Sequence, residues 1–137
     1  MRRITKIGAA LAGAGVVVGM TAVPASAASG TWTPYNWYTN VGATGTYTKD
    51  SRMVTVRGTV SDYRRDGYTA CVRFLFTEPG TTGVYSTFRI VTSSGGNFDG
   101  SGKASIKMSS SRTGHLYVQE CRLKAGKYSY GKGKRIY

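Results

Sequence analysis

Apolar residues recur at every second position through much of the chain, and this alternation limits the fold more than any other feature of the sequence. Successive side chains of a β-strand point to opposite faces, so a period of two predicts strands with one buried and one wet face. No segment beyond residue 27 has the helical period of an amphipathic helix. The alternating apolar positions are Val54, Val56, Val60, Ala70, Val72, Phe74, Phe76, Ala104, Ile106, Met108, Leu116 and Val118.

Turn-forming residues divide these runs about every eight to twelve positions, as in all-β domains. The dipeptide Asp66-Gly67 separates the runs 52–62 and 68–77, and we expect the two runs to pair as a β-hairpin. Another strand is predicted around Phe88, before a polar, glycine-rich loop from Ser93 to Gly102 that we expect to be exposed.

The predicted fold class is therefore all-β. We expect an antiparallel β-sandwich or a partly open barrel of about seven or eight strands, with one disulfide. A last strand near Ile136-Tyr137 would close the sheet, although Gly131 and Gly133 weaken the strand pattern just before it.

The first 27 residues have the parts of an export signal. A charged start precedes an apolar stretch, 7–20, that is too short and too rich in glycine to span a membrane comfortably. The segment Ala25-Ser26-Ala27 then supplies the small-x-small pattern that signal peptidase cleaves. We expect a signal peptide, 1–27, followed by one secreted, extracellular domain, 28–137, with no membrane span after processing.

The expected secreted domain is strongly basic. Without Arg2, Arg3 and Lys6 the chain keeps 16 basic and 6 acidic residues, a net charge of +10, and its 110 residues suit a single core. Such a charge keeps a protein soluble and attracts polyanions, but it does not determine a fold. A solubilising charge and an anionic partner are therefore both open interpretations.

Cys71 and Cys121 are the only cysteines, and both lie in the exported part, where the environment is oxidising. We expect a structural disulfide between them. The spacing resembles the bridge between the two sheets of an immunoglobulin domain, but Gln119 stands where that family places its corner tyrosine. A bridge between sheets and a bridge within one sheet both remain open.

Two runs of the sequence resemble small secreted proteins of actinomycetes, a group with no assigned function. They are VTVRGTVSDYRRDGYTACVRF, from Val54 to Phe74, and HLYVQECR, from His115 to Arg122. The Ala/Gly/Val-rich leader is similar as well, and together these segments cover about half of the chain. The resemblance implies an exported β domain, and it implies neither an activity nor site residues.

His115 is the only histidine, so acid–base catalysis of the usual kind would have to use it. A small secreted ribonuclease would combine it with Glu78 or Glu120, yet such enzymes pack a helix on a sheet, and no helix is predicted here. The loop Gly95–Gly100 offers one carboxylate where calcium loops gather several, and Gly100–Lys103 lacks residues that a phosphate-binding loop requires. The sequence therefore predicts no metal, no nucleotide and no other cofactor.

Aromatic residues crowd the start of the expected domain and its C-terminal tail. Such rings stack on sugars and nucleobases, or they pack within a β-sheet. The tail interleaves tyrosines with cations, no acid follows Glu120, and we expect the tail to be solvated. The candidate ligand-binding residues are Trp32, Tyr35, Trp37, Lys127, Tyr128, Tyr130, Lys132, Lys134 and Arg135.

These features favour a non-catalytic extracellular binding module, whose partner is an anionic cell-wall polymer or a polysaccharide. The alternative is a proteinaceous inhibitor of an extracellular enzyme, with the turn from Tyr63 to Asp66 as its contact loop. A small hydrolase or nuclease that uses His115 ranks third.

Overall fold

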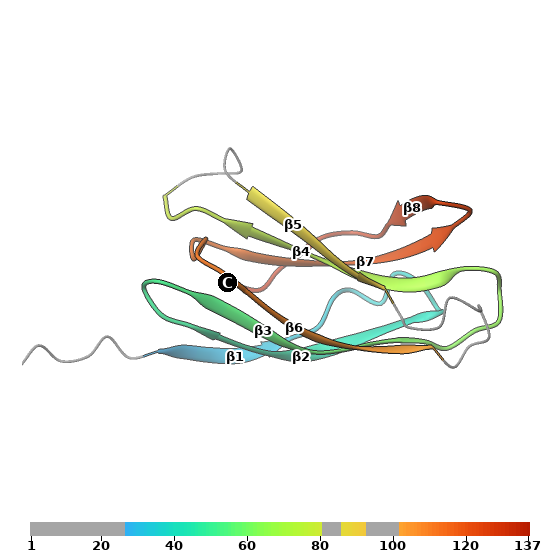
Figure 1. Ribbon diagram of the computed structural model, residues 1–137, viewed down its shortest axis with the longest axis horizontal. Coiled ribbons are helices and arrows are strands. Elements are labelled where there is room, and N and C mark those ends of the chain that lie inside the picture. The colour runs from blue at the N-terminus through green and yellow to red at the C-terminus, as the bar shows by residue number, and fades with distance from the viewer. Residues whose placement is uncertain (1–26, 81–85, 93–101) are drawn as a thin grey trace, which may run out of the picture.

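The alternating runs pair into two antiparallel sheets that pack face to face, as Figure 1 shows. The computed structural model describes residues 27–80, 86–92 and 102–137. The predicted all-β sandwich is confirmed, and the described residues contain nine strands rather than seven or eight. The strands are β1 (Ala28–Trp32), β2 (Val41–Lys49), β3 (Val54–Asp62), β4 (Thr69–Thr77), β5 (Ser86–Thr92), β6 (Lys103–Ser110), β7 (Leu116–Lys124), β8 (Lys127–Tyr130) and β9 (Lys134–Arg135).

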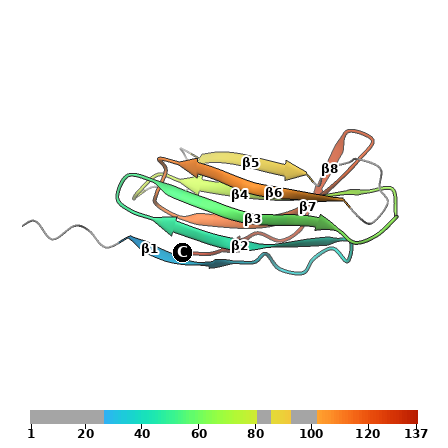
Figure 2. The same cartoon turned by 60° about the horizontal axis from the view of Figure 1, so that its bottom comes forward.

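The chain crosses from one sheet to the other three times. One sheet has the strand order β1-β2-β3-β6, and the other has the order β5-β4-β7-β8, with β9 also paired to β7. The crossings follow β3, β5 and β6, so the two sheets are interleaved along the sequence (Figure 2). Because neither sheet is made from one half of the chain, the two sheets form a single domain.

The expected hairpin between the runs 52–62 and 68–77 is wrong. β3 pairs with β2 and β6, whereas β4 belongs to the other sheet and pairs with β5 and β7. The connection between them is held by Asp62, whose two carboxylate oxygens accept the backbone N–H groups of Arg64 and Ala70 at 3.1 and 3.0 Å. The Asp66-Gly67 turn thus lies within a longer connection, which carries the chain across the space of about 10 Å that separates packed sheets.

The core contains the residues that the alternation predicts. Val54, Val56, Val60, Ala70, Val72, Phe74, Phe76, Leu116 and Val118 are fully buried, and Ile106 is nearly so. Ala104 and Met108 pack against this cluster as partly buried residues.

Trp32 also belongs to the core, which corrects its assignment as a ligand-binding residue. Its side chain is 1% exposed, and its ring meets Phe74 of the opposite sheet edge to face at 4.8 Å. Two glycines that face each other across β2 and β3, Gly45 and Gly58, leave the space for the indole, since an added Cβ at either would stand 2.6 Å from Trp32. The indole N–H lies 3.1 Å from the carbonyl oxygens of Thr46 and Arg57, so its polar atom is satisfied inside the core.

Cys71 and Cys121 form the predicted disulfide, and the bond lies within one sheet. The two residues face each other on the neighbouring strands β4 and β7, with their Cα atoms 4.8 Å apart. The bond therefore does not join the two sheets as the immunoglobulin bridge does.

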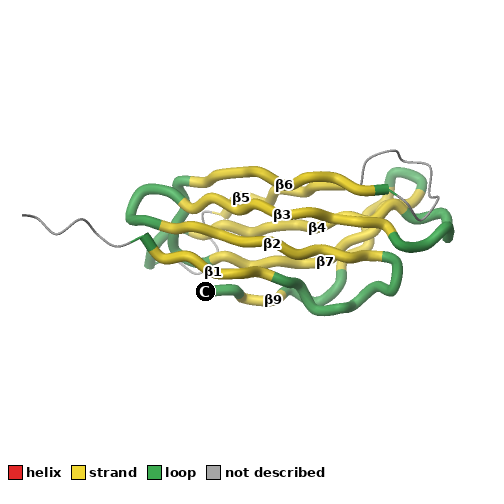
Figure 3. Tube along the Cα trace, turned by 90° about the horizontal axis from the view of Figure 1, so that it is seen from below, coloured by secondary structure: helices red, strands yellow, loops and turns green. Residues whose placement is uncertain are grey.

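The C-terminus lies beside β1, at the edge where the two sheets meet (Figures 2 and 3). The ring of Tyr137 packs on Tyr47 of the first sheet at 5.1 Å, and Ile136 N–H donates to Leu116 of the second sheet. Burial, with a smaller contribution from Tyr47, raises the pKa of Tyr137 to about 12.

Several expectations fall on residues outside the described ranges. They are the signal peptide up to residue 26, most of the loop from Ser93 to Gly102, and the calcium-like segment Gly95–Gly100.

Candidate functional site: an aromatic and basic surface

The C-terminal tail forms an edge of the second sheet rather than a free terminus. The expectation of a solvated tail is therefore wrong for its backbone, which is hydrogen-bonded to β7. β8 pairs with residues 121–124 of β7, and Gly131 N–H continues the ladder by donating to Glu120 O at 2.9 Å. β9 then pairs with residues 117–118, so only Lys132 and Gly133 interrupt the edge. The side chains of β8 are all exposed, as expected for an outer edge.

The two tyrosines of this edge form a pair of parallel rings. A two-residue turn, Ala125-Gly126, joins β7 to β8, and both turn residues have positive φ, as a tight hairpin turn requires. Tyr128 and Tyr130 are two positions apart in β8, so their side chains project from the same face of the strand. Their rings stack with centroids 6.0 Å apart and an interplanar angle of 13°.

A segment from the start of the domain packs against the same edge of the sheet. Trp37 packs directly on Gly131, where an added Cβ would stand 2.7 Å from Trp37 Cβ. Lys134 Nζ lies 3.4 Å from the hydroxyl of Thr33, and the ammonium groups of Lys132 and Lys134 lie 5.5 and 5.6 Å from the centre of the Tyr35 ring. Residues about a hundred positions apart in the sequence therefore form one surface.

Glu120 holds this segment against the sheet. Its side chain is buried, and its Oε2 atom accepts the backbone N–H groups of Trp37 and Tyr38 at 2.7 and 2.8 Å. The other oxygen, Oε1, is buried and has no hydrogen-bond partner among the described residues. Burial raises the pKa of the Glu120 carboxyl, and the two N–H donors only partly oppose that rise.

The sequence-predicted residues thus separate into two groups. Trp32 and Arg135 lie apart from the surface, Trp32 in the core and Arg135 beside His115, whose Nδ1 is 3.1 Å from Arg135 Nη2. The others form what we call the aromatic–basic surface. Its residues are Tyr35, Trp37, Lys127, Tyr128, Tyr130, Lys132 and Lys134.

Arg73 and Gln119, which sequence reasoning missed, adjoin this surface. They face each other across β4 and β7, and both Nε and Nη2 of Arg73 donate to Gln119 Oε1, the first at 3.0 Å. The Arg73 guanidinium lies over the Tyr130 ring, 3.7 Å from its centre, and Gln119 Nε2 donates to Gly131 O. The signal that could have found them is the disulfide. If Cys71 and Cys121 face each other on neighbouring antiparallel strands, then Arg73, two residues after Cys71, must face Gln119, two residues before Cys121.

A hollow at another end of the sandwich includes His115. It has a volume of about 520 Å³ and is lined among others by Lys49, Asp50 and His115. The backbone N–H groups of Arg52 and then Met53 lower the pKa of Asp50 by donating to its Oδ1 atom.

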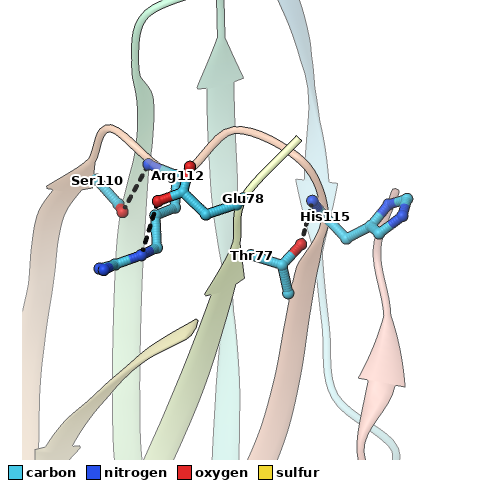
Figure 4. A network of polar contacts seen from close by, with 5 residues as sticks. All are labelled: Thr77, Glu78, Ser110, Arg112 and His115. Atoms are coloured by element: carbon cyan, nitrogen blue, oxygen red, sulfur yellow. Dashed lines mark hydrogen bonds and ion pairs between the residues drawn. The ribbon is translucent and has the colours of Figure 1, made fainter. Parts of the chain in front are cut away.

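The residues that a ribonuclease mechanism would combine do not converge. Glu78 Oε1 pairs with Arg112 Nε at 3.1 Å, and Figure 4 shows the imidazole of His115 pointing away from this pair. His115 contacts Thr77 through its backbone: its N–H donates to the Thr77 hydroxyl at 2.8 Å, and its carbonyl accepts the Thr77 N–H at 3.1 Å. Glu120 lies buried under Trp37 and Tyr38 instead.

The described residues contain no cluster of three or more His, Cys, Asp or Glu side chains that could hold a metal ion. In the same part of the chain, no helix has the length and apolar character to cross a membrane. The chain matches no protein-family model, no curated protein and no solved structure.

Proposed function

We propose that the protein is a secreted, non-catalytic binding module that attaches to an anionic polymer outside the cell through the aromatic–basic surface. The observation that carries this proposal is the approach of Tyr35 and Trp37 to the β8–β9 edge, where Tyr35 lies near the ammonium groups of Lys132 and Lys134 and Trp37 packs on Gly131. Trp37 is 56% exposed, although its side chain packs on Gly131 and its backbone N–H donates to Glu120. Exposed rings held in place lose little freedom on binding, and this favours contact with a ligand.

Charge supports the same proposal. The chain carries a net charge of +13, and no acidic residue follows Glu120, whose carboxyl is buried rather than displayed. A polymer that neutralises several of these cations releases its own counterions, so its affinity should fall steeply as salt concentration rises. The export signal and the disulfide support an extracellular location, and the mature chain should begin at Ala28 when its N-terminus is sequenced.

The test is the salt dependence of binding to immobilised polyphosphate. Replacing Lys127, Lys132 and Lys134 together with glutamine should lower the slope of log affinity against log salt by about 2, taking roughly 0.7 per charge as for single-stranded nucleic acid. Replacing Tyr128 and Tyr130 with alanine should leave this slope unchanged, because neither side chain is charged, and it should weaken binding only to polymers that offer rings to stack on.

A matched control removes the same charge from the opposite side of the molecule. Arg57, Lys103 and Lys107 are exposed on β3 and β6 of the first sheet, and their replacement by glutamine should leave most of the affinity. Equal losses from the two triple variants would mean that the attraction comes from the overall charge of the molecule and not from the aromatic–basic surface. The proposed function would then fail.

A second candidate function, inhibition of an extracellular enzyme, is favoured by the connection between β3 and β4. Tyr63 is 65% exposed there, beside Arg64 and Arg65. Asp62 accepts the N–H of Arg64, and Asp66 accepts the N–H of Tyr68 at 3.0 Å, so the exposed turn is braced at both ends. Rigid exposed loops suit protease and glycosidase inhibitors.

The two functions differ in their response to salt. An inhibitor should form a complex of nanomolar affinity with one secreted hydrolase and keep it at moderate salt. Changing Arg64 and Arg65 to alanine should then abolish inhibition, whereas the triple lysine variant should retain it. A panel of secreted proteases and amylases provides the assay.

A further inference from the structure

A small hollow opens on the outer face of the second sheet, next to the stacked tyrosines. It has a volume of about 180 Å³ and is lined by Arg73, Leu75, Tyr117, Gln119 and Gly133. Its floor consists of two residue pairs that face each other across β4 and β7, Arg73 with Gln119 and Leu75 with Tyr117. These strands have neighbours on both sides and are joined by the disulfide, so the floor is rigid.

The lining combines an aromatic ring, an aliphatic side chain and two fixed polar groups. Gln119 is held by Arg73 on one side and by Gly131 O on the other, and Arg73 is held in turn by Gln119 and by the Tyr130 ring. Such a combination, an apolar wall with a few oriented polar groups, is typical of sites for small polar rings. Sugars have this character, because one face of the ring is apolar and its edge carries hydroxyl groups.

Both rings and charges border the hollow. In the order of the chain the edge presents Lys127, Tyr128, Tyr130, Lys132 and Lys134, and Tyr130 contacts Arg73 in the wall of the hollow. A polymer that complements both the hollow and this edge must offer sugar-sized rings as well as negative charges. A chain of uronic acids offers both, whereas polyphosphate offers charge without rings and a neutral glycan offers rings without charge.

We propose that the ligand of the aromatic–basic surface is a polysaccharide of carboxylate-bearing sugars, and that one sugar ring occupies the hollow beside Tyr130. The inference rests on the proposed function and specifies its ligand class. Arg73 supplies positive charge next to the ring, as expected for recognition of a carboxylate. The neighbouring sugars would lie along the stacked pair of Tyr128 and Tyr130.

Gly133 offers a way to block the hollow without disturbing the fold. A Cβ built on Gly133 meets no atom within 4 Å, and its φ is outside the left-handed region, so a larger side chain is tolerated by the backbone. Leucine at this position should project into the hollow that Gly133 lines. A second variant, Tyr117→Ala, removes a wall of the hollow rather than adding bulk, and unchanged melting temperatures would show that both variants fold.

The experiment measures the binding of the wild type and of Gly133→Leu to three polymers. Polygalacturonate has rings and carboxylates, its methyl ester has the same rings without the charge, and polyphosphate has the charge without rings. The wild type should bind polygalacturonate best. Gly133→Leu should weaken that binding by about tenfold or more, the scale of losing one stacking contact, and should leave polyphosphate binding unchanged.

The outcomes separate this inference from the function on which it rests. If polyphosphate binds as tightly as polygalacturonate, or if neither Gly133→Leu nor Tyr117→Ala changes polygalacturonate binding, the uronate inference is overturned and general polyanion binding remains. If sulfated dextran binds more tightly than polygalacturonate, the carboxylate assignment is overturned. If the wild type binds none of these polymers, the proposed function fails as well.

Discussion

Trp37 lies directly on Gly131, and the contact leaves no room for a side chain at Gly131, because an added Cβ would stand 2.7 Å from both Cβ and Cγ of Trp37. Gly131 is buried in the edge of the second sheet, while Trp37 comes from the segment between β1 and β2. This one contact therefore fixes an exposed indole on the edge strand that carries the stacked tyrosines.

Gly131→Ala should displace Trp37 and lower the free energy of unfolding by about 1–3 kcal/mol, the usual cost of overpacking. The loss is measured by urea unfolding, and a shift of the Trp37 fluorescence in the folded protein should accompany it. Gly133→Ala, two residues away in open space, is the matched control for stability and should change it by less than about 0.5 kcal/mol. Equal effects of the two variants would contradict the contact.

Glu120 should give the protein an unusual dependence of stability on pH. Burial raises the pKa of its carboxyl in the folded state above the usual 4.5. The folded state then binds more protons than the unfolded state between these two pKa values, so the contribution of Glu120 is fully present below 4.5 and is lost as pH rises through the folded pKa.

Glu120→Gln removes this titration, and the amide oxygen can still accept the N–H groups of Trp37 and Tyr38. Its unfolding free energy relative to the wild type should therefore increase from about pH 4 to about pH 8. Glu78→Gln is the comparison, since Glu78 lies in a partly exposed ion pair that contributes little. A difference between Glu120→Gln and wild type that stays flat or falls with pH would exclude this role.

The period of two predicted which side chains of β3, β4, β6 and β7 face the core, but it could not predict which strands are neighbours. Val60 and Ala70 point inward in a hairpin and also in two facing sheets, so the alternation is the same in both arrangements. The hydrogen bonds of Asp62 to Arg64 and Ala70, which hold the crossing from β3 to β4, form only in the folded protein and leave no pattern in the sequence. β2 escaped prediction because glycine stands at position 45, where an alternating pattern would have an apolar side chain.

The sequence predicted the aromatic and basic character of the candidate site, but it did not predict all of the residues that form it. The tyrosines and lysines of the tail are adjacent in the sequence, whereas Arg73, Tyr117 and Gln119 join them only through the register of β4 on β7. Trp32 was misassigned because it lies in the same aromatic-rich stretch as Trp37, and nearness in the sequence does not show which ring faces the core. Glycines inside strand patterns, such as Gly45 and Gly58, are the available signal that a large side chain approaches the backbone.

The disulfide should contribute a large share of the stability. Cys71 and Cys121 are separated by 50 residues, and closing such a loop stabilises the fold by about 4 kcal/mol in the chain-entropy model. The double variant Cys71→Ala, Cys121→Ala should lose a comparable free energy in urea unfolding. Thiol titration of the denatured wild type should find two thiols after reduction and none before it, and an unchanged melting temperature on reduction would contradict the expected stabilisation.

The two tryptophans should respond in opposite ways to substitution. Trp32→Ala empties the slot over Gly45 and Gly58 and should cost about 3–5 kcal/mol, as deletion of a large buried ring usually does. Trp37 is 56% exposed, so Trp37→Ala should cost about 1 kcal/mol in urea unfolding.

Polymer binding should reverse this order. Trp37→Ala should weaken binding to polygalacturonate by about fivefold or more, because it removes an exposed ring of the surface. For Trp32 the informative variant is Trp32→Phe, which stays apolar and gives up the N–H contacts to Thr46 and Arg57 together with part of the ring volume. That variant should bind as the wild type does once it is folded, because its ring lies inside the sandwich. If Trp32→Phe loses binding while Trp37→Ala keeps it, the ligand does not contact the aromatic–basic surface.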